Sequence, residues 1–425
     1  MIMLSKYNFY KEEESRIIIY NSISDNIQTI NNEDFNNIIE NEAQINSEQF
    51  ELLFNNDMLI LDDVDDARKF QYRLNKFVFS QELRITVLVT TNCNFTCSYC
   101  YQDYEIQYID DEFEHSFLLF IKRNIKNYKN LSISWFGGEP LIVSKRLLNL
   151  SNQISKICKE AGVSYMGNLT SNGFNLTEKL FFQLVNSGIK FFQVTIDGNK
   201  EDHDSLRKLK NGKGSYERII NNLKQISYNP SKAFFRIGIR NNVYRNNVHK
   251  SFFEEFKIHF ENDRRFSYFQ YPIKDWGGEK INAIKNELLS DEEILIDNTN
   301  SFMNRSFSER TCYAVRQQGF SITPDLKVYK CHHFTGKAVI NQKGMSKVNF
   351  VGKIDLEGNL KQNEKTVSDW HSLVIPNECD ECPYLVNCIL DNCPLIALEK
   401  NEECKVREQS KIDTRFNKFI QMEKQ

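Results

Sequence analysis

The sequence has 425 residues, more than one hydrophobic core usually supports, so we expect two or three domains. Hydrophobic residues make up 40% of the chain and aromatic residues 12%, which excludes a wholly disordered protein. The net charge of −3, the lack of an apolar run of about 20 residues and an N-terminus without a signal-peptide core predict a cytoplasmic protein with no nucleic-acid or membrane partner.

Residues 1–80 have the pattern of a small separate unit. Short strands are expected at residues 7–12, 16–20 and 26–30, and helices at 32–40, at 47–55 and before residue 80. Strands followed by small helices are typical of a winged-helix-like module. The same pattern also fits a cap on the domain that follows.

A regular alternation of strands and helices begins near residue 84. Strands are expected at residues 84–89, 131–136, 165–170, 191–196, 234–239 and 266–271, and helices at 110–128, 145–161, 177–187, 215–226 and 246–260. This alternation predicts an α/β fold with a parallel sheet. Because a closed barrel has eight such units, we expect an open, partial (β/α)6 barrel over residues 81–300.

Distinctive residues follow the ends of the first four predicted strands. They are Cys93 after the first strand, Gly137, Gly138, Glu139 and Pro140 after the second, Ser171 and Asn172 after the third, and Thr195 to Gly198 after the fourth. Each group also fits an ordinary turn. In α/β folds, however, the chemistry lies at this edge of the sheet, so four groups in register predict a functional site there.

Eleven cysteines are unevenly distributed, with three at residues 93–100, one at Cys158 and seven at residues 312–404. In a cytoplasmic chain this clustering favours metal or redox chemistry over disulfides. Cys158 lies on a helical pattern far from the other cysteines, so we expect it to be a buried structural thiol.

The first cluster supplies three thiol groups, from Cys93, Cys97 and Cys100. A structural zinc ion and an iron–sulfur cluster each normally take four protein ligands. An iron–sulfur cluster held by only three cysteines leaves one iron open to a small chelating molecule. Tyr99 is suited to shield such a cluster or to stack on an adenine. Zinc and a disulfide remain the alternatives.

The CxxxCxxC spacing, with an aromatic residue before the last cysteine and GGEP after the next strand, resembles the radical S-adenosylmethionine (SAM) enzymes over about residues 84–275. The resemblance implies that Cys93, Cys97 and Cys100 hold a [4Fe–4S] cluster whose open iron binds SAM. It also implies that the turn Gly137–Pro140 orients the amino group of SAM. Reductive cleavage of SAM, with electrons from a flavodoxin or ferredoxin, would then give a 5′-deoxyadenosyl radical that removes hydrogen from the substrate.

A second stretch resembles one large subgroup of these enzymes, with the pattern (S/T)-x-D-G, H-D-x-x-R and G-x-G-(S/T) over residues 195–215. By that match Thr195 and Arg207 are candidates to hold the carboxylate of SAM, and a guanidinium suits a carboxylate chemically. A surface salt bridge is the alternative for Arg207. Asn172 is a weaker candidate for contacts with the ribose or the amino acid of SAM.

The seven C-terminal cysteines resemble the SPASM extension of radical enzymes that act on peptides, here over residues 301–425. The resemblance implies two auxiliary [4Fe–4S] clusters, and so three clusters in all. The first set is Cys312, Cys331 and Cys393, and the second is Cys379, Cys382, Cys388 and Cys404. The gap before Cys393 is one residue longer than the family pattern. The first set lacks a fourth cysteine, so a substrate thiolate or His332 is a candidate ligand, and a zinc ribbon remains an alternative for the CxxC pair.

Two further features suggest the substrate. The stretch from Cys331 to Gly336 resembles one that is common among peptide maturases, and residues 1–80 weakly resemble the module that captures leader peptides. We therefore expect a maturase that cross-links a ribosomally synthesised precursor peptide with a leader, by a thioether or another bond. The alternatives are a formylglycine-forming sulfatase maturase, a peptide epimerase and a non-catalytic iron–sulfur protein.

Overall fold

The computed structural model describes residues 2–40, 47–102, 105–247, 252–275, 280–289, 306–335, 349–371, 379, 382–393 and 404–424. The chain divides into two compact units. Unit 1 comprises Met1–Ser80, Ser290–Gln317 and Leu373–Gln425, and unit 2 comprises Gln81–Leu289 and Gln318–Ser372. Each unit is described by itself.

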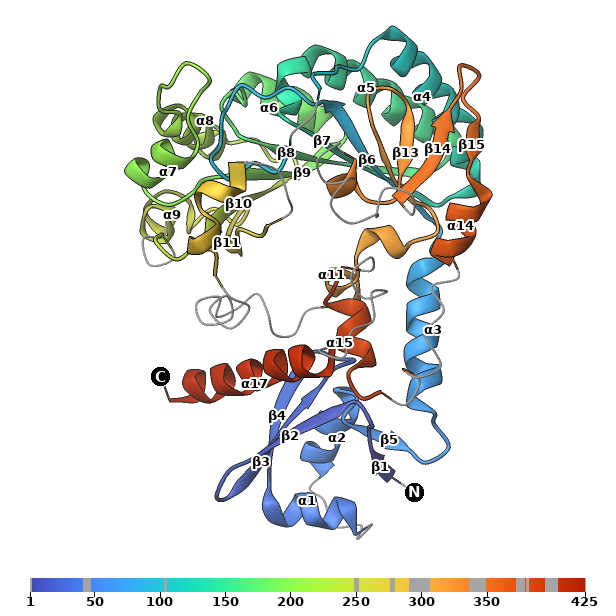
Figure 1. Ribbon diagram of the computed structural model, residues 1–425, viewed down its shortest axis with the longest axis vertical. Coiled ribbons are helices and arrows are strands. Elements are labelled where there is room, and N and C mark those ends of the chain that lie inside the picture. Colours follow the sequence, from blue (N-terminus) through green and yellow to red (C-terminus); the bar gives the residue numbers. More distant parts are fainter. Residues whose placement is uncertain are drawn as a thin grey trace. The chain divides into compact units, whose positions relative to one another are not determined.

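A ten-stranded sheet forms the centre of unit 2 (Figure 1). Its parallel part has the order β11-β10-β9-β8-β7-β6. These strands are β6 (Glu82–Thr90), β7 (Asn130–Gly137), β8 (Ser164–Ser171), β9 (Ile189–Thr195), β10 (Arg236–Val243) and β11 (Phe266–Pro272). The prediction of an α/β fold with a parallel sheet is confirmed, and each strand overlaps its predicted range.

Helices alternate with these strands and run along the outer side of the sheet (Figure 1). They are α4 (Asp111–Asn124), α5 (Ser144–Ala161), α6 (Glu178–Asn186), α7 (Lys200–Leu206), α8 (Tyr216–Tyr228) and α9 (Phe253–Phe260). Side-chain caps begin several of them: the Asp110 side chain accepts a hydrogen bond from Phe113 N (2.8 Å). The core lies between the sheet and the helices and includes the fully buried Trp135. The short helix α7 was not predicted, and residues 248–251 of the last predicted helix lie outside the described residues.

The sheet continues beyond β6 with strands from the C-terminal part of the chain. β12 (Gly319–Ile322) pairs in parallel with β6, and β13 (Lys327–Tyr329), β14 (Phe350–Ile354) and β15 (Leu360–Gln362) follow in antiparallel order. The short helices η6 (His332–Phe334) and α14 (Glu364–His371) flank these strands in the chain. These four strands, which we assigned to the C-terminal domain from the sequence, therefore extend the sheet of unit 2.

Unit 1 contains a three-stranded antiparallel sheet of β2 (Asn8–Glu12), β3 (Arg16–Asn21) and β4 (Asn26–Asn31), and a two-stranded sheet of β1 (Ile2–Leu4) and β5 (Leu59–Leu61). Its helices include α1 (Asn32–Ile39), α2 (Ser47–Asn55), α3 (Asp66–Val78), α11 (Phe307–Arg310), α15 (Leu385–Leu390) and α17 (Cys404–Glu423). The three-stranded sheet is buried on both faces. One face packs on α1 and α2 through Ile17 and Ile19, and the other packs on Ile412 and Phe416 of α17 through Ile18.

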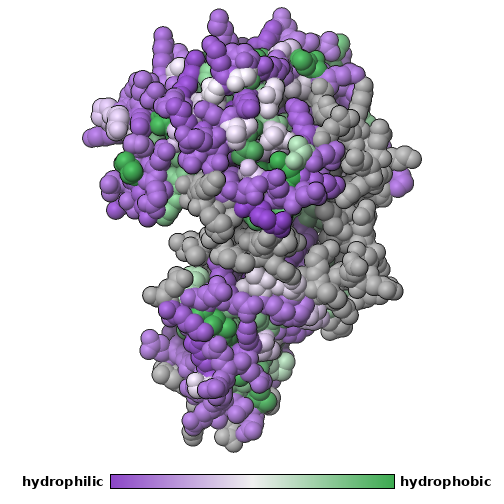
Figure 2. Space-filling model, turned by 60° about the vertical axis from the view of Figure 1, so that its left-hand side comes forward, coloured by the Kyte–Doolittle hydropathy of each residue, from purple (hydrophilic) through white to green (hydrophobic). Residues whose placement is uncertain are grey.

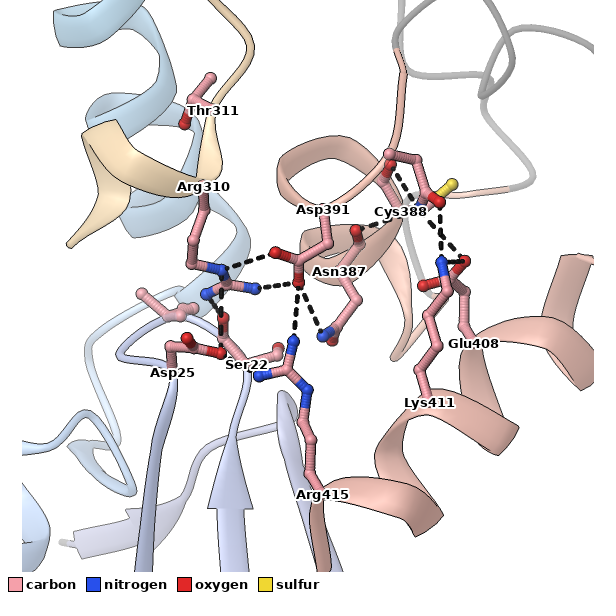
Figure 3. Close-up of polar contacts among 12 residues, drawn as sticks. Ser22, Asp25, Arg310, Thr311, Asn387, Cys388, Asp391, Glu408, Lys411 and Arg415 are labelled. Atoms are coloured by element: carbon pink, nitrogen blue, oxygen red, sulfur yellow. Dashed lines mark hydrogen bonds and ion pairs between the residues drawn. The ribbon is translucent and has the colours of Figure 1, made fainter. Parts of the chain in front are cut away.

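A buried network of charges joins separate segments of unit 1 (Figure 3). Arg310 donates to both oxygens of Asp391, at 3.1 Å from Nε and 2.8 Å from Nη2, and Nη1 donates to the carbonyl of Ser22. Arg415 pairs with Asp25 and, at 3.3 Å, with Asp391. Two guanidinium groups thus face two carboxylates, and the network connects the β3–β4 turn to α15 and α17.

The surface of the described residues is mostly hydrophilic, and hydrophobic residues lie scattered over the face drawn in Figure 2. No helix within the described ranges combines the length and the apolar character that crossing a membrane requires.

Candidate functional site

The loop that follows β6 carries the cysteine triplet at the carboxyl edge of the parallel strands. The backbone N–H groups of Thr96 and Ser98 donate to the carbonyls of Lys208 (2.8 Å) and Leu206 (3.1 Å), which fastens the loop to the segment around α7. Cys93 Sγ accepts from Phe95 N at 3.4 Å. The triplet is therefore held by backbone contacts at the edge where the strand pattern predicts it.

Burial disfavours the charged form of Cys93 and Cys97. Burial raises the pKa of the Cys97 thiol to about 12, with Cys100 and Cys93 as further causes. It also raises the pKa of Cys93, with Glu139 and Cys100 as further causes. Thiolates are what metals bind, so charged sulfur here needs a cationic partner. No group of three His, Cys, Asp or Glu side chains in the described residues is arranged to hold a single metal ion. Three thiols on one loop fit an iron–sulfur cluster with an open iron.

The glycine turn after β7 lies against the chain that leads into Cys93. Gly138 N donates to Thr90 O at 2.9 Å. Gly137 has φ +135°, and a Cβ atom on it would lie 2.1 Å from Thr90 O. A Cβ atom on Gly138 would lie 2.3 Å from Asn92 O. Only glycine permits this approach, so the turn and the start of the cysteine loop are fixed together.

Glu139 uses both carboxylate oxygens inside the protein. Oε1 accepts from Leu141 N and Ser171 Oγ, each at 2.9 Å, and Oε2 accepts from Asn172 N at 2.7 Å. Burial raises its pKa, and these hydrogen bonds counteract that rise. Pro140 begins the short helix η2 (Pro140–Val143) directly after it. The Glu139 side chain therefore connects the turns after β7 and β8.

Asn172 lies beside the cysteine loop. Its Nδ2 donates to Asn94 Oδ1 at 2.8 Å, and its Oδ1 accepts from Phe174 N at 3.0 Å. The side chain is thus oriented by the turn after β8 at one end and by the cysteine loop at the other.

Tyr99 is held through its hydroxyl by residues of three other segments. The hydroxyl donates to Asp197 Oδ2 and accepts from Arg207 Nη1 (2.5 Å) and Asn242 Nδ2 (2.9 Å). Asp197 is fully buried, its other oxygen accepts from Asn242 N at 2.9 Å, and burial raises its pKa. The cysteine loop is thereby connected to the ends of β9 and β10.

Arg207 is buried and has an unused donor. Nη1 lies 3.6 Å from Asp197 Oδ2, but Nε has no hydrogen-bond partner within the described part of the chain. A buried guanidinium nitrogen without a partner is costly, so it indicates a missing acceptor. Thr195, the last residue of β9, is also buried at this edge. Both residues therefore fit the carboxylate of SAM as a ligand.

The residues around Arg207 belong to the H-D-x-x-R and G-x-G-(S/T) parts of the motif over residues 195–215. His203 Nδ1 accepts from Asp197 N (3.2 Å), and its Nε2 lies 3.0 Å from Ser215 Oγ, which donates to Arg207 O. Burial lowers the pKa of His203 well below its usual value, so the ring is neutral. Asp204 Oδ1 accepts from Ser215 N at 2.7 Å, and a Cβ atom on Gly214 would collide with this carboxylate. The motif thus fixes the position of Arg207.

Sequence reasoning missed several polar residues at the same edge, among them Asn242 and Arg240 of β10. Arg240 Nε donates to Asn242 Oδ1 at 2.8 Å, and Cζ lies 3.9 Å from the centre of the Tyr271 ring. The available signal was the polar run Arg240 to Asn242 directly after the apolar residues 237–239 of this strand.

The segment after β13 brings His332 and His333 to the same sheet. The His332 ring packs on Phe136 at 4.7 Å, and the His333 ring packs on Tyr101 at 5.0 Å. Burial, with Arg240 as a second cause, lowers the pKa of His333 to about 4. Both histidines therefore line the edge that carries the cysteine triplet.

The other predicted cluster ligands are distributed over both units. Cys331 is buried in unit 2, whereas Cys312, Cys379, Cys382, Cys388 and Cys393 belong to unit 1. Cys382 N donates to Cys379 O at 3.0 Å, and Cys388 lies on α15. Cys404 begins α17, and its side chain lies outside the described part. Both auxiliary ligand sets remain predictions.

Comparison with known proteins identifies the central part of the chain. Residues 87–240 match the model of the radical SAM superfamily. A cysteine-type anaerobic sulfatase-maturating enzyme of Clostridium novyi (strain NT) is 25% identical over 148 residues, which are 32% of this chain and 37% of that enzyme. The sporulation killing factor maturation protein SkfB of Bacillus subtilis (strain 168) is 25% identical over 144 residues, 33% of this chain and 32% of that protein. These alignments span about a third of each relative.

Among solved structures, native anSMEcpe with bound AdoMet and Kp18Cys peptide is similar, with a TM-score of 0.56 and 16% sequence identity. The similarity covers 80% of this chain and 99% of that one. At this level of identity the likeness extends to the fold alone.

Proposed function

Because residues 87–240 form a radical SAM domain, we propose that the protein is a maturase that cross-links a ribosomally synthesised precursor peptide, with a thioether as the expected bond. The observation that carries the proposal is the convergence of the Cys93–Cys100 loop, the Gly137–Gly138 turn and the unsatisfied Nε of Arg207 at one sheet edge. A maturation protein and a maturating enzyme among the relatives support a peptide or protein substrate.

Different residues at this edge would bind the cluster and SAM. Cys93, Cys97 and Cys100 would hold the [4Fe–4S] cluster, and the glycine turn with Thr195, Arg207 and Asn172 would hold SAM. When bound and reduced, these groups supply a 5′-deoxyadenosyl radical that removes hydrogen from the substrate. The protein's own contribution is to fix positions. Glu139 holds the glycine turn, and Asp197 and Arg207 hold Tyr99 and with it the cysteine loop.

Unit 1 offers a place for the leader of the precursor. In its three-stranded sheet the outer strands β2 and β4 each pair with one strand among the described residues, and an extended peptide binds such an edge by adding a strand. We assign the seven C-terminal cysteines to two auxiliary clusters, with the open position of the first as the candidate site for a substrate thiolate. A flavodoxin or ferredoxin would supply electrons in the cytoplasm.

The first experiment is anaerobic incubation of the reconstituted, reduced protein with SAM and the short peptide encoded beside it. We expect 5′-deoxyadenosine and a peptide that is lighter by about two mass units, because a cross-link removes two hydrogen atoms. Replacing Cys93, Cys97 and Cys100 by Ala should abolish both products, whereas Cys158→Ala, in a buried cysteine on α5, should not. Retained cleavage in the triple variant would end the proposal. An unchanged mass with deuterium incorporated from solvent would indicate epimerisation.

A second candidate is the oxidation of a Cys or Ser in a sulfatase to formylglycine, and the Clostridium novyi relative favours it. Incubation with a sulfatase-derived cysteine peptide separates the two, because only this candidate yields an aldehyde that reacts with a hydrazine probe. Absence of 5′-deoxyadenosine with either peptide would favour a non-catalytic iron–sulfur protein.

A further inference from the structure

Arg240 stands at the carboxyl end of β10, level with the residues that we assign to SAM. It pairs in register with Thr195 of β9, and Ile196 N donates to its carbonyl at 2.9 Å. Its guanidinium stacks on the Tyr271 ring, with 3.9 Å from Cζ to the ring centre, and Nε is fixed by Asn242 Oδ1 at 2.8 Å. The hydrogen bond at Nε and the stacking of one guanidinium face on Tyr271 therefore fix the orientation of the Arg240 side chain.

The two terminal nitrogens of Arg240 bond to nothing in the described residues, which leaves the end of the fork open. Arg265 of the same unit provides a contrast. Its Nε and Nη2 bond to Asp263, and Nη1 and Nη2 also bond to backbone carbonyls of residues 227–231. An arginine that only stabilises the fold uses its fork in this way. Arg240 is half-buried and held in place, but its fork is unused.

Arg240 forms no ion pair with a carboxylate among the described residues. Arg207 and Arg240 both adjoin the network of Tyr99 and Asn242, and Asp197 is the carboxylate within it. Both oxygens of Asp197 are already used, by Tyr99 and by Asn242 N. Arg207, with its unsatisfied Nε, accounts for the carboxylate of SAM. The guanidinium of Arg240 therefore remains without an anionic hydrogen-bond partner among the described residues.

We propose that Arg240 binds a carboxylate of the substrate peptide, either an Asp or Glu side chain or the C-terminus, and so helps to select and position that peptide. The proposal rests on the function proposed above. Nη1 and Nη2 match the two oxygens of a carboxylate as a pair of parallel hydrogen bonds. Tyr101 and His333, which pack together at 5.0 Å, lie close enough to Arg240 for electrostatic interaction and extend the same surface.

The test is affinity selection by the full chain, reconstituted anaerobically with iron, sulfide and SAM. The probe is a synthetic library of hexapeptides with one fixed Cys, in which Asp alternates with Asn, Glu with Gln, and a free C-terminus with an amide. We expect carboxylate peptides to be enriched about 10-fold or more over their amides, as for hydrogen bonds to charged groups. Enrichment at a side-chain position or at the C-terminus identifies the source of the carboxylate.

Arg240→Gln should lose this enrichment, and Arg240→Lys should keep only part of it, because Lys retains the charge without the fork. Arg236→Gln is the matched control, an exposed arginine at the other end of β10, and it should select peptides as the wild type does. Lack of carboxylate enrichment in the wild type, or its persistence in Arg240→Gln, would overturn the proposal. A loss of SAM affinity in Arg240→Gln with peptide selection intact would also do so, by placing Arg240 in the nucleotide site.

Selection measures binding alone, so it is independent of radical chemistry. If the wild type makes no 5′-deoxyadenosine yet selects carboxylate peptides through Arg240, the proposed function fails and the peptide site stands. If Arg240→Gln does not fold, as judged by iron content and protease resistance, the Arg240→Lys variant decides the matter.

Discussion

Each unit contains a polar network built around two arginines, and the arginines of the two networks have different partners. In unit 1, Arg310 and Arg415 face Asp25 and Asp391, so each charge meets an opposite charge. At the sheet edge of unit 2, Arg207 pairs with Asp197 and Arg240 bonds to Asn242 through Nε. Among the described residues, Arg207 Nε and the terminal nitrogens of Arg240 have no hydrogen-bond partner.

The difference separates a network that stabilises the fold from one that binds a ligand. A buried ion pair is costly to break, because removing one partner leaves an uncompensated charge. An incomplete network bears part of that cost already, and a charged ligand relieves it. We therefore expect substitutions in unit 1 to change stability and substitutions at the sheet edge to change binding.

The largest effect is expected from Asp391→Ala, which removes one of the two carboxylates that face the arginines of unit 1. The free energy of unfolding should fall by about 3–5 kcal/mol, as for other broken buried pairs. This change in the free energy of unfolding is measured by urea unfolding, monitored through the protease resistance of the N-terminal segment. Asp413→Ala, on the exposed side of α17, is the control and should change stability by less than about 0.5 kcal/mol. Equal effects of the two variants would contradict a stabilising role for the network.

Arg207→Lys tests the open network. Lysine keeps the charge but has no Nε and no planar fork, so the affinity for SAM should fall about 10- to 100-fold, while the fold persists. Equilibrium dialysis with labelled SAM measures this change. Arg218→Lys is the matched control, because Arg218 is exposed and stacks on Phe174. Unchanged SAM affinity in Arg207→Lys would remove this residue from the cofactor site.

His203 predicts a pH dependence of unit 2. Because burial depresses its pKa in the folded state, the unfolded chain binds the proton first as pH falls below about 6.5. The stability that the neutral ring contributes is therefore complete above that pH and lost below it, by about 1.4 kcal/mol per pH unit until the depressed pKa is reached. Unfolding curves between pH 7.5 and 5.5 measure the slope. His203→Gln keeps an acceptor and a donor without titrating, so it should flatten the slope, and an unchanged slope would assign the dependence to other groups.

Local patterns allowed most of the barrel to be predicted, because each strand and helix reflects the periodicity of its own residues. The cysteine loop and the glycine turn were found in the same way, since their spacing lies within one segment. The role of Arg240 could not be found, because it depends on Tyr271 and Asn242 meeting across adjacent strands. The charge network of unit 1 was missed for a similar reason: Asp25 and Arg415 are 390 residues apart in the chain.

The smallest effect is expected at Cys158, which belongs to neither network. It is 1% exposed on α5, it packs in the core of unit 2, and burial raises the pKa of its thiol to about 11, so it stays protonated and uncharged. Cys158→Ala removes one sulfur atom from a packed core and should cost about 1 kcal/mol. Its iron content, measured after reconstitution, should equal that of the wild type, whereas replacing Cys97 should lower it. A loss of iron in Cys158→Ala would show that the surroundings of a cysteine do not distinguish a structural thiol from a cluster ligand. It would also weaken the distinction between stabilising and ligand-binding regions.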